Sequence, residues 1–176
     1  AMKEELHFSS SLEDSKLDFR GTRFDVRTLG KRDVVLHPGA VVILPLLDDE
    51  HILMIKNERF AVGETLWELP AGTLEPREHP DATASRELVE ETGYEAKKIE
   101  PLTTFYTSPG ICNERMFAYT AQDLIYVGQK LDETEKITVE VVEWKKIREM
   151  IFNGEIHDGK TLTTLLFYLY FLQKEI

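Results

Sequence analysis

The chain has 176 residues, of which 42% are hydrophobic, so it is long enough and apolar enough for one globular domain with a sizeable core. Its formal net charge of −11 argues against a nucleic-acid backbone or an anionic membrane as the main partner, because both are bound through basic surfaces. The single cysteine, Cys112, excludes an internal disulfide framework, and without a signal-peptide pattern the expected compartment is cytoplasmic.

The N-terminal part is expected to be a polar extension followed by a β-hairpin. Residues 2–16 are rich in Ser and Glu and show no clear period, so no catalytic group is expected there. Residues 17–27 and 33–37 alternate as β-strands do, and residues 29–31 provide a turn between them. A short N-terminal β-hairpin is the prediction.

The next segment predicts strands that lead into a helix. Residues 40–47 and 51–56 are aliphatic, β-branched runs around a turn-like acidic triplet, and residues 66–69 can extend the same sheet. Pro80 in a first helical turn and Gly93 just past a last turn bracket a helix of about three turns.

The remainder of the chain predicts further strands and two closing helices. Strands are expected at 99–107, 115–121 and 137–144, an acidic loop at 128–136, and helices at 145–152 and 161–174. Asp158 is a suitable N-cap for the last helix, whose apolar run is shorter than the roughly 20 residues that span a bilayer. The pattern indicates an α+β chain, or an α/β/α sandwich with a mixed β-sheet.

The helix between Pro80 and Gly93 carries an unusual concentration of glutamates. At about 100° per residue, Glu87, Glu90 and Glu91 fall on one face. The opposite, packing face is expected to consist of Ala82, Ser85, Leu88, Val89 and Thr92. Three carboxylates within one turn repel each other, and Mg²⁺ or Mn²⁺ are the cations that such hard oxygen ligands suit. A glutamate-rich face that is simply solvated is the alternative.

The order and spacing of these residues resemble the Nudix box, G-x5-E-x7-R-E-U-x-E-E-x-G-U, in which U is aliphatic. The matching positions are Gly72, Glu78, Arg86, Glu87, Leu88, Glu90, Glu91 and Gly93. Tyr94 stands at the last aliphatic position, a departure that concerns packing rather than the carboxylates. The resemblance implies the Nudix fold, with residues 38–176 as the catalytic domain, and two or three Mg²⁺ ions, with Mn²⁺ as the alternative.

Carried over position by position, the resemblance implies roles for the residues of the box. It makes Glu87 and Glu91 the principal metal ligands, with Glu90 assisting them. Arg86 then orients a carboxylate, and Glu78 steadies the loop. The backbone carbonyl of Ala71 completes the metal shell in the branch of the family that hydrolyses ADP-sugars. Gly72 is expected to permit a tight turn into the box.

Two flanking segments resemble the ADP-ribose pyrophosphatase and ADP-sugar diphosphatase branch. Residues 68–72 read Glu-Leu-Pro-Ala-Gly, as at the start of the box in that branch, and Ser108-Pro109-Gly110 follows with Pro109 sixteen residues past Gly93. A Pro-Gly turn at a strand end can form a rigid wall beside the ribose or diphosphate, although most such triplets are ordinary turns. The resemblance covers roughly residues 20–170.

Further residues are assigned to substrate binding and proton transfer by the same resemblance. Arg59 is expected to hold a phosphate, for which the planar guanidinium is suited, whereas a surface salt bridge is the structural alternative. Glu68 is expected to bind ribose hydroxyls or metal-bound water, and Glu114 matches another acidic position of the branch. Glu135, or else Glu133, is expected to be the general base that activates water.

The expected function is metal-dependent hydrolysis of ADP-ribose, or a related nucleoside diphosphate sugar, to AMP and ribose 5-phosphate. The alternatives are a non-catalytic Nudix-fold sensor of the same ligands and a hydrolase that prefers GDP- or UDP-sugars. The partner is thus a small molecule, with neither nucleic acid nor membrane. In this branch the N-terminal strands commonly cross to a second subunit, so the resemblance implies a homodimer with residues 1–37 as the dimerisation element.

Overall fold

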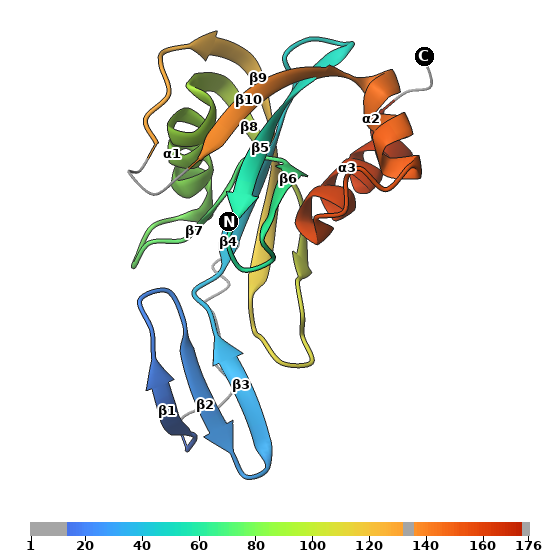
Figure 1. Ribbon diagram of the computed structural model, residues 1–176. Helices are drawn as coiled ribbons and strands as arrows, with labels where there is room; N and C mark the ends of the chain where they lie inside the picture. Colours follow the sequence, from blue (N-terminus) through green and yellow to red (C-terminus); the bar gives the residue numbers. More distant parts are fainter. Residues whose placement is uncertain (1–13, 132–135, 174–176) are drawn as a thin grey trace.

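The computed structural model describes residues 14–131 and 136–173, which form three sheets and three helices (Figure 1). The N-terminal sheet consists of β1 (Lys16–Arg20), β2 (Asp25–Leu29) and β3 (Arg32–Leu36). The central sheet has the order β7 (Ala71–Thr73), β4 (Ala40–Pro45), β9 (Arg115–Tyr126) and β8 (Tyr94–Tyr106). The third sheet has the order β10 (Ile137–Glu143), β5 (His51–Arg59) and β6 (Glu64–Glu68). The helices are α1 (Pro80–Thr92), α2 (Trp144–Phe152) and α3 (Gly159–Phe171).

Strand β4 lies in the middle of the structure, and its alternating side chains divide the core into two layers. Val41 packs on the side of α1 together with Leu88. Val42 and Leu44 point to the opposite side, where they share a cluster with Ile147 of α2. Because successive residues of a strand face opposite ways, an apolar strand buried on both faces needs a helix layer on each side. The expected α/β/α sandwich is therefore present, with α1 on one side and α2 and α3 on the other (Figure 1).

The central sheet is mixed, as expected. Strand β4 pairs in parallel with β9, in a register that places Ala40 opposite Met116. Strands β8 and β9 form a long antiparallel pair from Tyr94 opposite Tyr126 to Tyr106 opposite Arg115. Both are longer than expected, because pairing continues past the buried part of the sheet into exposed residues at the far end.

The N-terminal sheet has three antiparallel strands rather than the two of the expected hairpin. The segment expected as one strand, 17–27, is divided by a turn in which the amide of Gly21 donates to the carbonyl of Phe24, at 2.9 Å. The sheet projects away from the rest of the molecule (Figure 1). It is joined through β3, where Val35 donates to the carbonyl of Ile111 (2.8 Å) and accepts from the amide of Asn113 (3.2 Å).

The ends of α1 agree with the prediction, whereas its packing face does not. Pro80 lies in the first turn, and Gly93 ends the helix in the left-handed conformation, with φ of 78°. Ala82 and Ser85, expected on the packing face, are exposed. The buried face consists of Thr83, Ala84, Leu88, Glu91 and Thr92. The helix is thus rotated so that one of the glutamates, Glu91, turns towards the sheet.

Helix α3 begins at Gly159, two residues earlier than expected, with Asp158 as its N-cap. The Asp158 carboxylate accepts a hydrogen bond from the amide of Thr161, at 3.0 Å, which confirms the predicted cap. Within the described parts of the chain, no helix is both long and apolar enough to cross a membrane.

Candidate active site

Strand β7 and helix α1 approach so closely that the carboxyl group of Glu87 fills the space beside Gly72. A Cβ atom at residue 72 would overlap this carboxyl group, whereas real Cβ atoms essentially never come within 3.0 Å of a neighbour. Gly72 is not among the glycines with positive φ, and it pairs with Val41 inside the sheet. The expectation that it permits a tight turn is therefore wrong: the glycine is needed for the close approach of a carboxylate.

Arg86 is the centre of a partly buried ionic cluster on α1. Its Nε and Nη2 donate to the two oxygens of Glu78, at 3.1 and 2.9 Å. Its Nη1 donates to Glu87 at 2.8 Å and to Glu90 at 2.9 Å. The bonds from Arg86 lower the pKa of Glu78 from 4.5 to about 2, and they also raise the pKa of the guanidinium itself. Glu78 thus secures the arginine that orients the two other carboxylates.

Glu91 is the most deeply buried of the glutamates on α1, with 3% of its surface exposed. Its Oε2 accepts a hydrogen bond of 2.8 Å from the backbone amide of Ala71. Its backbone carbonyl accepts a bond of 2.6 Å from the side chain of Gln129, in the segment that follows β9. The structure therefore brings Ala71 and Glu91 together through the Ala71 amide, while a role for the Ala71 carbonyl stays a prediction.

The donor set suits divalent cations, although the carboxylates are not gathered around a common point. Within residues 14–131 and 136–173, no three His, Cys, Asp or Glu side chains are arranged to hold a metal ion. Arg86 holds Glu87 and Glu90, while Glu91 is bonded to Ala71. The cluster nevertheless contains four carboxylates, with Glu78, against the one guanidinium of Arg86. This excess of negative charge on hard oxygen atoms fits Mg²⁺ or Mn²⁺.

Arg59 and Glu68, both expected to bind substrate, bind each other. Nε and Nη2 of Arg59 donate to the two carboxylate oxygens of Glu68, each at 2.7 Å. Glu68 is completely buried, and the Arg59 side chain is 41% exposed. The hydrogen bonds that Arg59 donates to Glu68 raise the pKa of Arg59, and the charge of Glu91 on the acidic helix adds to this effect. A salt bridge, the alternative considered for Arg59, is therefore present, although with a buried carboxylate; the guanidinium keeps an exposed side, so phosphate binding stays a prediction.

The Ser108-Pro109-Gly110 turn lies elsewhere, against the N-terminal sheet. It borders a hollow of about 400 Å³ whose other walls include Arg32 and Tyr106, and no residue of α1 or β7 lines this hollow. The structure thus does not place the turn and the acidic helix in one cavity.

Glu114 lies at the base of the same loop. Its Oε2 accepts a bond of 2.7 Å from the hydroxyl of Thr107, and its Oε1 lies 3.5 Å from Nδ1 of His37. Glu114 thus connects the loop to the residues that follow β3. The expected general bases, Glu133 and Glu135, lie outside the described residues.

Two polar residues near the site had not been assigned to it from the sequence. Gln129 bonds to the end of α1, as described above. Lys160, in the first turn of α3, forms an ion pair with Glu68. The two partners in this pair are 92 residues apart in the chain, so no local pattern indicated it.

Comparisons with known proteins agree with the fold and the cluster. The family described as NUDIX domain matches residues 36–165. An ADP-ribose pyrophosphatase of Bacillus subtilis is 43% identical over 133 residues, which are 74% of this chain and 72% of the relative. A methanol dehydrogenase activator of Bacillus methanolicus is 37% identical over 134 residues, which are 75% of this chain and 72% of the relative. An ADP-ribose pyrophosphatase of Mycobacterium tuberculosis is 38% identical over 139 residues, covering 77% and 67%.

A solved structure extends the agreement to the whole fold. The crystal structure of an ADP compounds hydrolase superposes with a TM-score of 0.75 over 90% of this chain and 91% of the other, at 20% sequence identity. At this identity the likeness concerns the fold. The family match covers most of the chain, including the acidic cluster on α1. The chain belongs to the Nudix family and is a Nudix pyrophosphohydrolase.

Proposed function

We propose that the protein hydrolyses the diphosphate of ADP-ribose, or of a closely related nucleoside diphosphate sugar, to AMP and ribose 5-phosphate. The observation that carries this proposal is the acidic cluster on α1, in which Arg86 bonds to both Glu87 and Glu90, the Glu87 carboxyl group lies beside Gly72, and Glu91 bonds to the amide of Ala71. A diphosphate is itself anionic, so it can approach these carboxylates only together with cations. The similarity to ADP-ribose pyrophosphatases supports the choice of substrate.

The residues of the box would hold Mg²⁺, with Mn²⁺ as the alternative and two or three ions in the site. Glu87 and Glu91 are the principal ligands in this proposal, Glu90 assists, and the carbonyl of Ala71 completes the set. Such ions, when bound, polarise phosphate oxygens and make water more acidic. Arg86 keeps Glu87 and Glu90 within reach of one another, because it is bonded to both.

The remaining roles concern the substrate and the attacking water. Arg59 presents the exposed side of its guanidinium to a phosphate and offsets charge that develops during the reaction. Glu68, completely buried, acts by orienting Arg59 rather than by binding ribose. Ser108-Pro109-Gly110, in a hollow apart from α1 and β7, is proposed as a wall beside the ribose or diphosphate, and Glu114 at the base of the same loop as a further substrate-binding residue. Glu135, or else Glu133, accepts the proton from water.

Turnover of ADP-ribose by a glutamine variant of the box tests this proposal. Wild-type protein with Mg²⁺ should release AMP, and Glu91→Gln should reduce the release by about 10³-fold or more, because a buried ligand charge is removed. Glu95→Gln, an exposed position just beyond the helix, is the matched control and should retain full activity. Thermal unfolding of both variants verifies that they are folded. AMP release by Glu91→Gln at the wild-type rate would refute the ligand assignment.

The two alternative functions, a hydrolase of GDP- or UDP-sugars and a non-catalytic sensor, can be tested with the same purified wild-type protein. A panel of ADP-, GDP- and UDP-sugars, compared by kcat/KM, identifies the preferred base. A sensor would bind ADP-ribose and leave it intact over hours with Mg²⁺ present. The similarity to a methanol dehydrogenase activator, whose name mentions no hydrolysis, is the reason to make this measurement.

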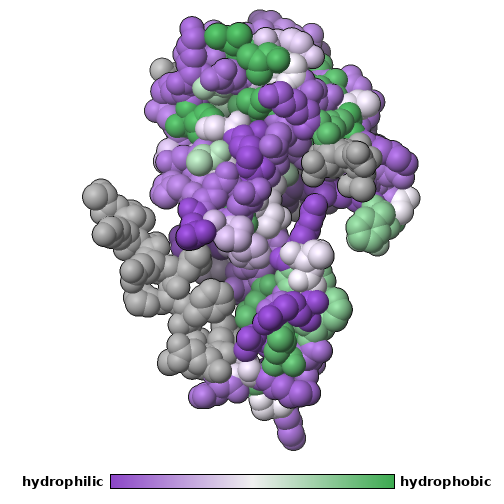
Figure 2. Space-filling view, turned by 90° about the vertical axis from the view of Figure 1, so that its left-hand side faces the viewer, coloured by the Kyte–Doolittle hydropathy of each residue, from purple (hydrophilic) through white to green (hydrophobic). Residues whose placement is uncertain are grey.

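We further propose a homodimer in which the N-terminal sheet is the dimerisation element. Phe19 and Phe24 on this sheet are 54% and 42% exposed and lie with their rings 6.2 Å apart. The face of the molecule seen in Figure 2 is largely hydrophilic over the main body, with apolar side chains also visible on the projecting sheet. Light scattering of wild type and of a Phe19→Ser, Phe24→Ser variant tests this assignment, which a dimeric variant would contradict.

A further inference from the structure

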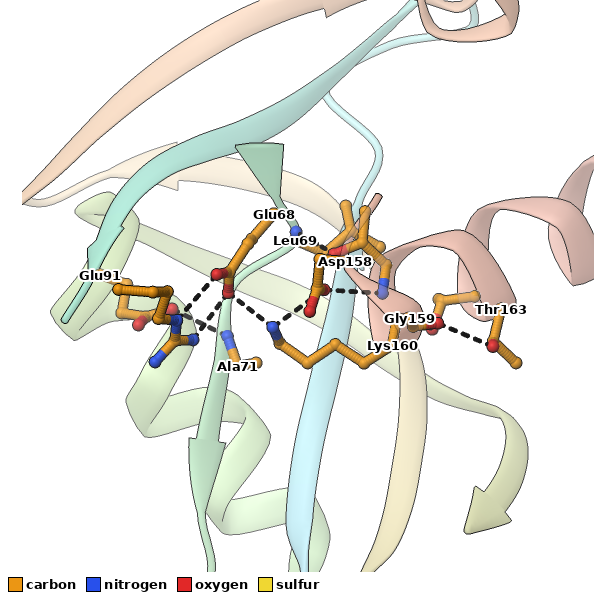
Figure 3. Close-up of polar contacts among 11 residues, drawn as sticks. Glu68, Leu69, Ala71, Glu91, Asp158, Gly159, Lys160 and Thr163 are labelled. Atoms are coloured by element: carbon orange, nitrogen blue, oxygen red, sulfur yellow. Dashed lines mark hydrogen bonds and ion pairs between the residues drawn. The ribbon is translucent and has the colours of Figure 1, made fainter. Parts of the chain in front are cut away.

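The buried carboxylate of Glu68 is held by two cations that come from different parts of the chain (Figure 3). Arg59, at the end of β5, forms the two-bonded pair described above. Lys160, in the first turn of α3, donates to Oε2 of Glu68 at 2.5 Å and to Asp158 at 2.9 Å. The Lys160 side chain is only 14% exposed, and its ammonium group is bonded to both carboxylates.

The position of Lys160 is fixed by bonds on both sides of it in the chain. Asp158 caps α3 by accepting from the amide of Thr161. The Thr161 hydroxyl in turn accepts from the amide of Leu69, at 2.9 Å, and Leu69 directly follows Glu68. The first turn of α3 is therefore fastened to the same backbone that carries Glu68. A lysine held in this way cannot move with a bound substrate. Its positive charge can nevertheless set the net charge of the groups beside the substrate.

The charges in this network balance only when Lys160 is included. Glu68 and Asp158 contribute two negative charges, and Arg59 and Lys160 contribute two positive charges. Without Lys160, the network carries one net negative charge beside Glu91, in a buried setting where charges are weakly screened. The positive charge of Arg59 would then be shared between two carboxylates instead of attracting a phosphate.

The geometry of the Arg59–Glu68 pair also leaves Arg59 able to bind a phosphate. The pair with Glu68 uses Nε and Nη2 of Arg59, and within the described residues no acceptor bonds to Nη1. Glu68 thus holds the plane of the guanidinium and leaves one edge of it for a further acceptor. Lys160 holds Oε2 of Glu68, the same atom that receives Nη2 of Arg59.

We infer that Lys160 is a positioning residue for the substrate diphosphate: it neutralises and fixes the buried Glu68 carboxylate, so that Arg59 can present its remaining donor to a phosphate. Asp158 supports this role by holding Lys160 in place. The inference rests on the proposed function, in which Arg59 binds a phosphate. It requires no contact between Lys160 and the substrate.

Three variants separate charge from packing. Lys160→Met keeps the length of the side chain and removes its charge. It should raise KM for ADP-ribose about tenfold or more while kcat changes less than about threefold, because ground-state attraction of the phosphate is lost. Lys160→Arg restores the charge and should recover most of the loss. Lys160→Met combined with Asp158→Asn returns the network to neutrality, with an amide oxygen still able to cap α3, and should recover affinity relative to Lys160→Met alone.

Equilibrium binding separates failure of this inference from failure of the proposed function. Titration calorimetry with Mg²⁺ and an ADP-ribose analogue whose two phosphorus atoms are joined by a methylene group measures affinity without turnover, and Lys160→Met should bind about tenfold more weakly than wild type. If wild type binds ADP-ribose without hydrolysing it, the proposed function fails while this comparison still tests Lys160. Equal affinities of wild type and Lys160→Met would overturn the inference. So would a double variant that is no better than Lys160→Met, because the role would then not be one of charge.

Discussion

Replacement of Gly72 by alanine tests the close approach of β7 and α1. The backbone of Gly72 is not in the left-handed region, so alanine introduces no backbone strain there. Its methyl group would, however, occupy the space of the Glu87 carboxyl group, whose carbon and both oxygens are the nearest atoms. The substitution therefore moves a proposed metal ligand without removing it.

The size of the effect follows from the overlap. Taking 3.0 Å as the closest real approach of a Cβ atom, the Glu87 carboxyl must move by about 1 Å or more. A misplacement of about 1 Å at a reacting centre costs about 10²-fold in rate, so kcat/KM should fall at least that much. The free energy of unfolding should change little, because the flexible Glu87 side chain can move away. Alanine also lowers the conformational entropy of the unfolded chain, which stabilises the protein by about 0.4–1 kcal/mol. The melting temperature should shift by less than about 4 °C.

The assay is AMP release from ADP-ribose with saturating Mg²⁺, paired with thermal unfolding. Gly159→Ala is the matched control, since a Cβ atom there meets no atom within 4 Å and the backbone φ is ordinary. It should leave activity unchanged. A Gly72→Ala enzyme with wild-type kcat/KM would refute the reasoning, and so would a variant that loses activity only because it is unfolded at the assay temperature.

Two further predictions concern the bonds around α1. Glu78→Gln should lower the free energy of unfolding by about 1 kcal/mol at pH 7, because the partly exposed ion pair with Arg86 is lost. The pKa of Glu78 is depressed from 4.5 to about 2, so its contribution is fully present above pH 4.5 and is lost as the pH falls towards 2. Urea denaturation should therefore show a difference between wild type and variant that shrinks across this window, and a difference independent of pH would contradict the assignment. Tyr119→Phe removes the hydroxyl that donates to Asp81 at 2.7 Å, and should cost about 1 kcal/mol while kcat/KM stays within about twofold. A large loss of its activity in a folded variant would show that this end of α1 takes part in the reaction.

Features determined by neighbouring residues were predictable from the sequence. Pro80 and Gly93 fixed the limits of α1, because the ring of proline suits a first turn and glycine accepts the left-handed conformation at a helix end. The aliphatic, β-branched run of residues 40–47 indicated a strand, and β4 is present there. The spacing of Arg86 and Glu90 placed them one turn apart, and they are bonded in the structure.

Features that depend on distant residues were not predictable in this way. The burial of Glu91 requires the amide of Ala71 as its partner, and helix periodicity contains no information about that strand. The pairing of Glu68 with Lys160 joins residues 92 positions apart. The role of Gly72 was missed because it depends on which side chain of α1 lies above it, a matter of helix rotation rather than of local turn preference.

The parallel pairing of β4 with β9 imposes an order on the folding of the chain. Ala40 meets Met116 only after the whole intervening segment, including α1, has been synthesised, and closing so long a loop is slow. The surface against which α1 packs includes Tyr119 and Ala121 of β9. The helix therefore lacks part of its packing surface until β9 has been synthesised. A nascent chain that ends before β9 therefore contains the glutamates of α1 but not the complete sheet that orients this helix. Tight capture of divalent ions should begin only when this strand has left the ribosome.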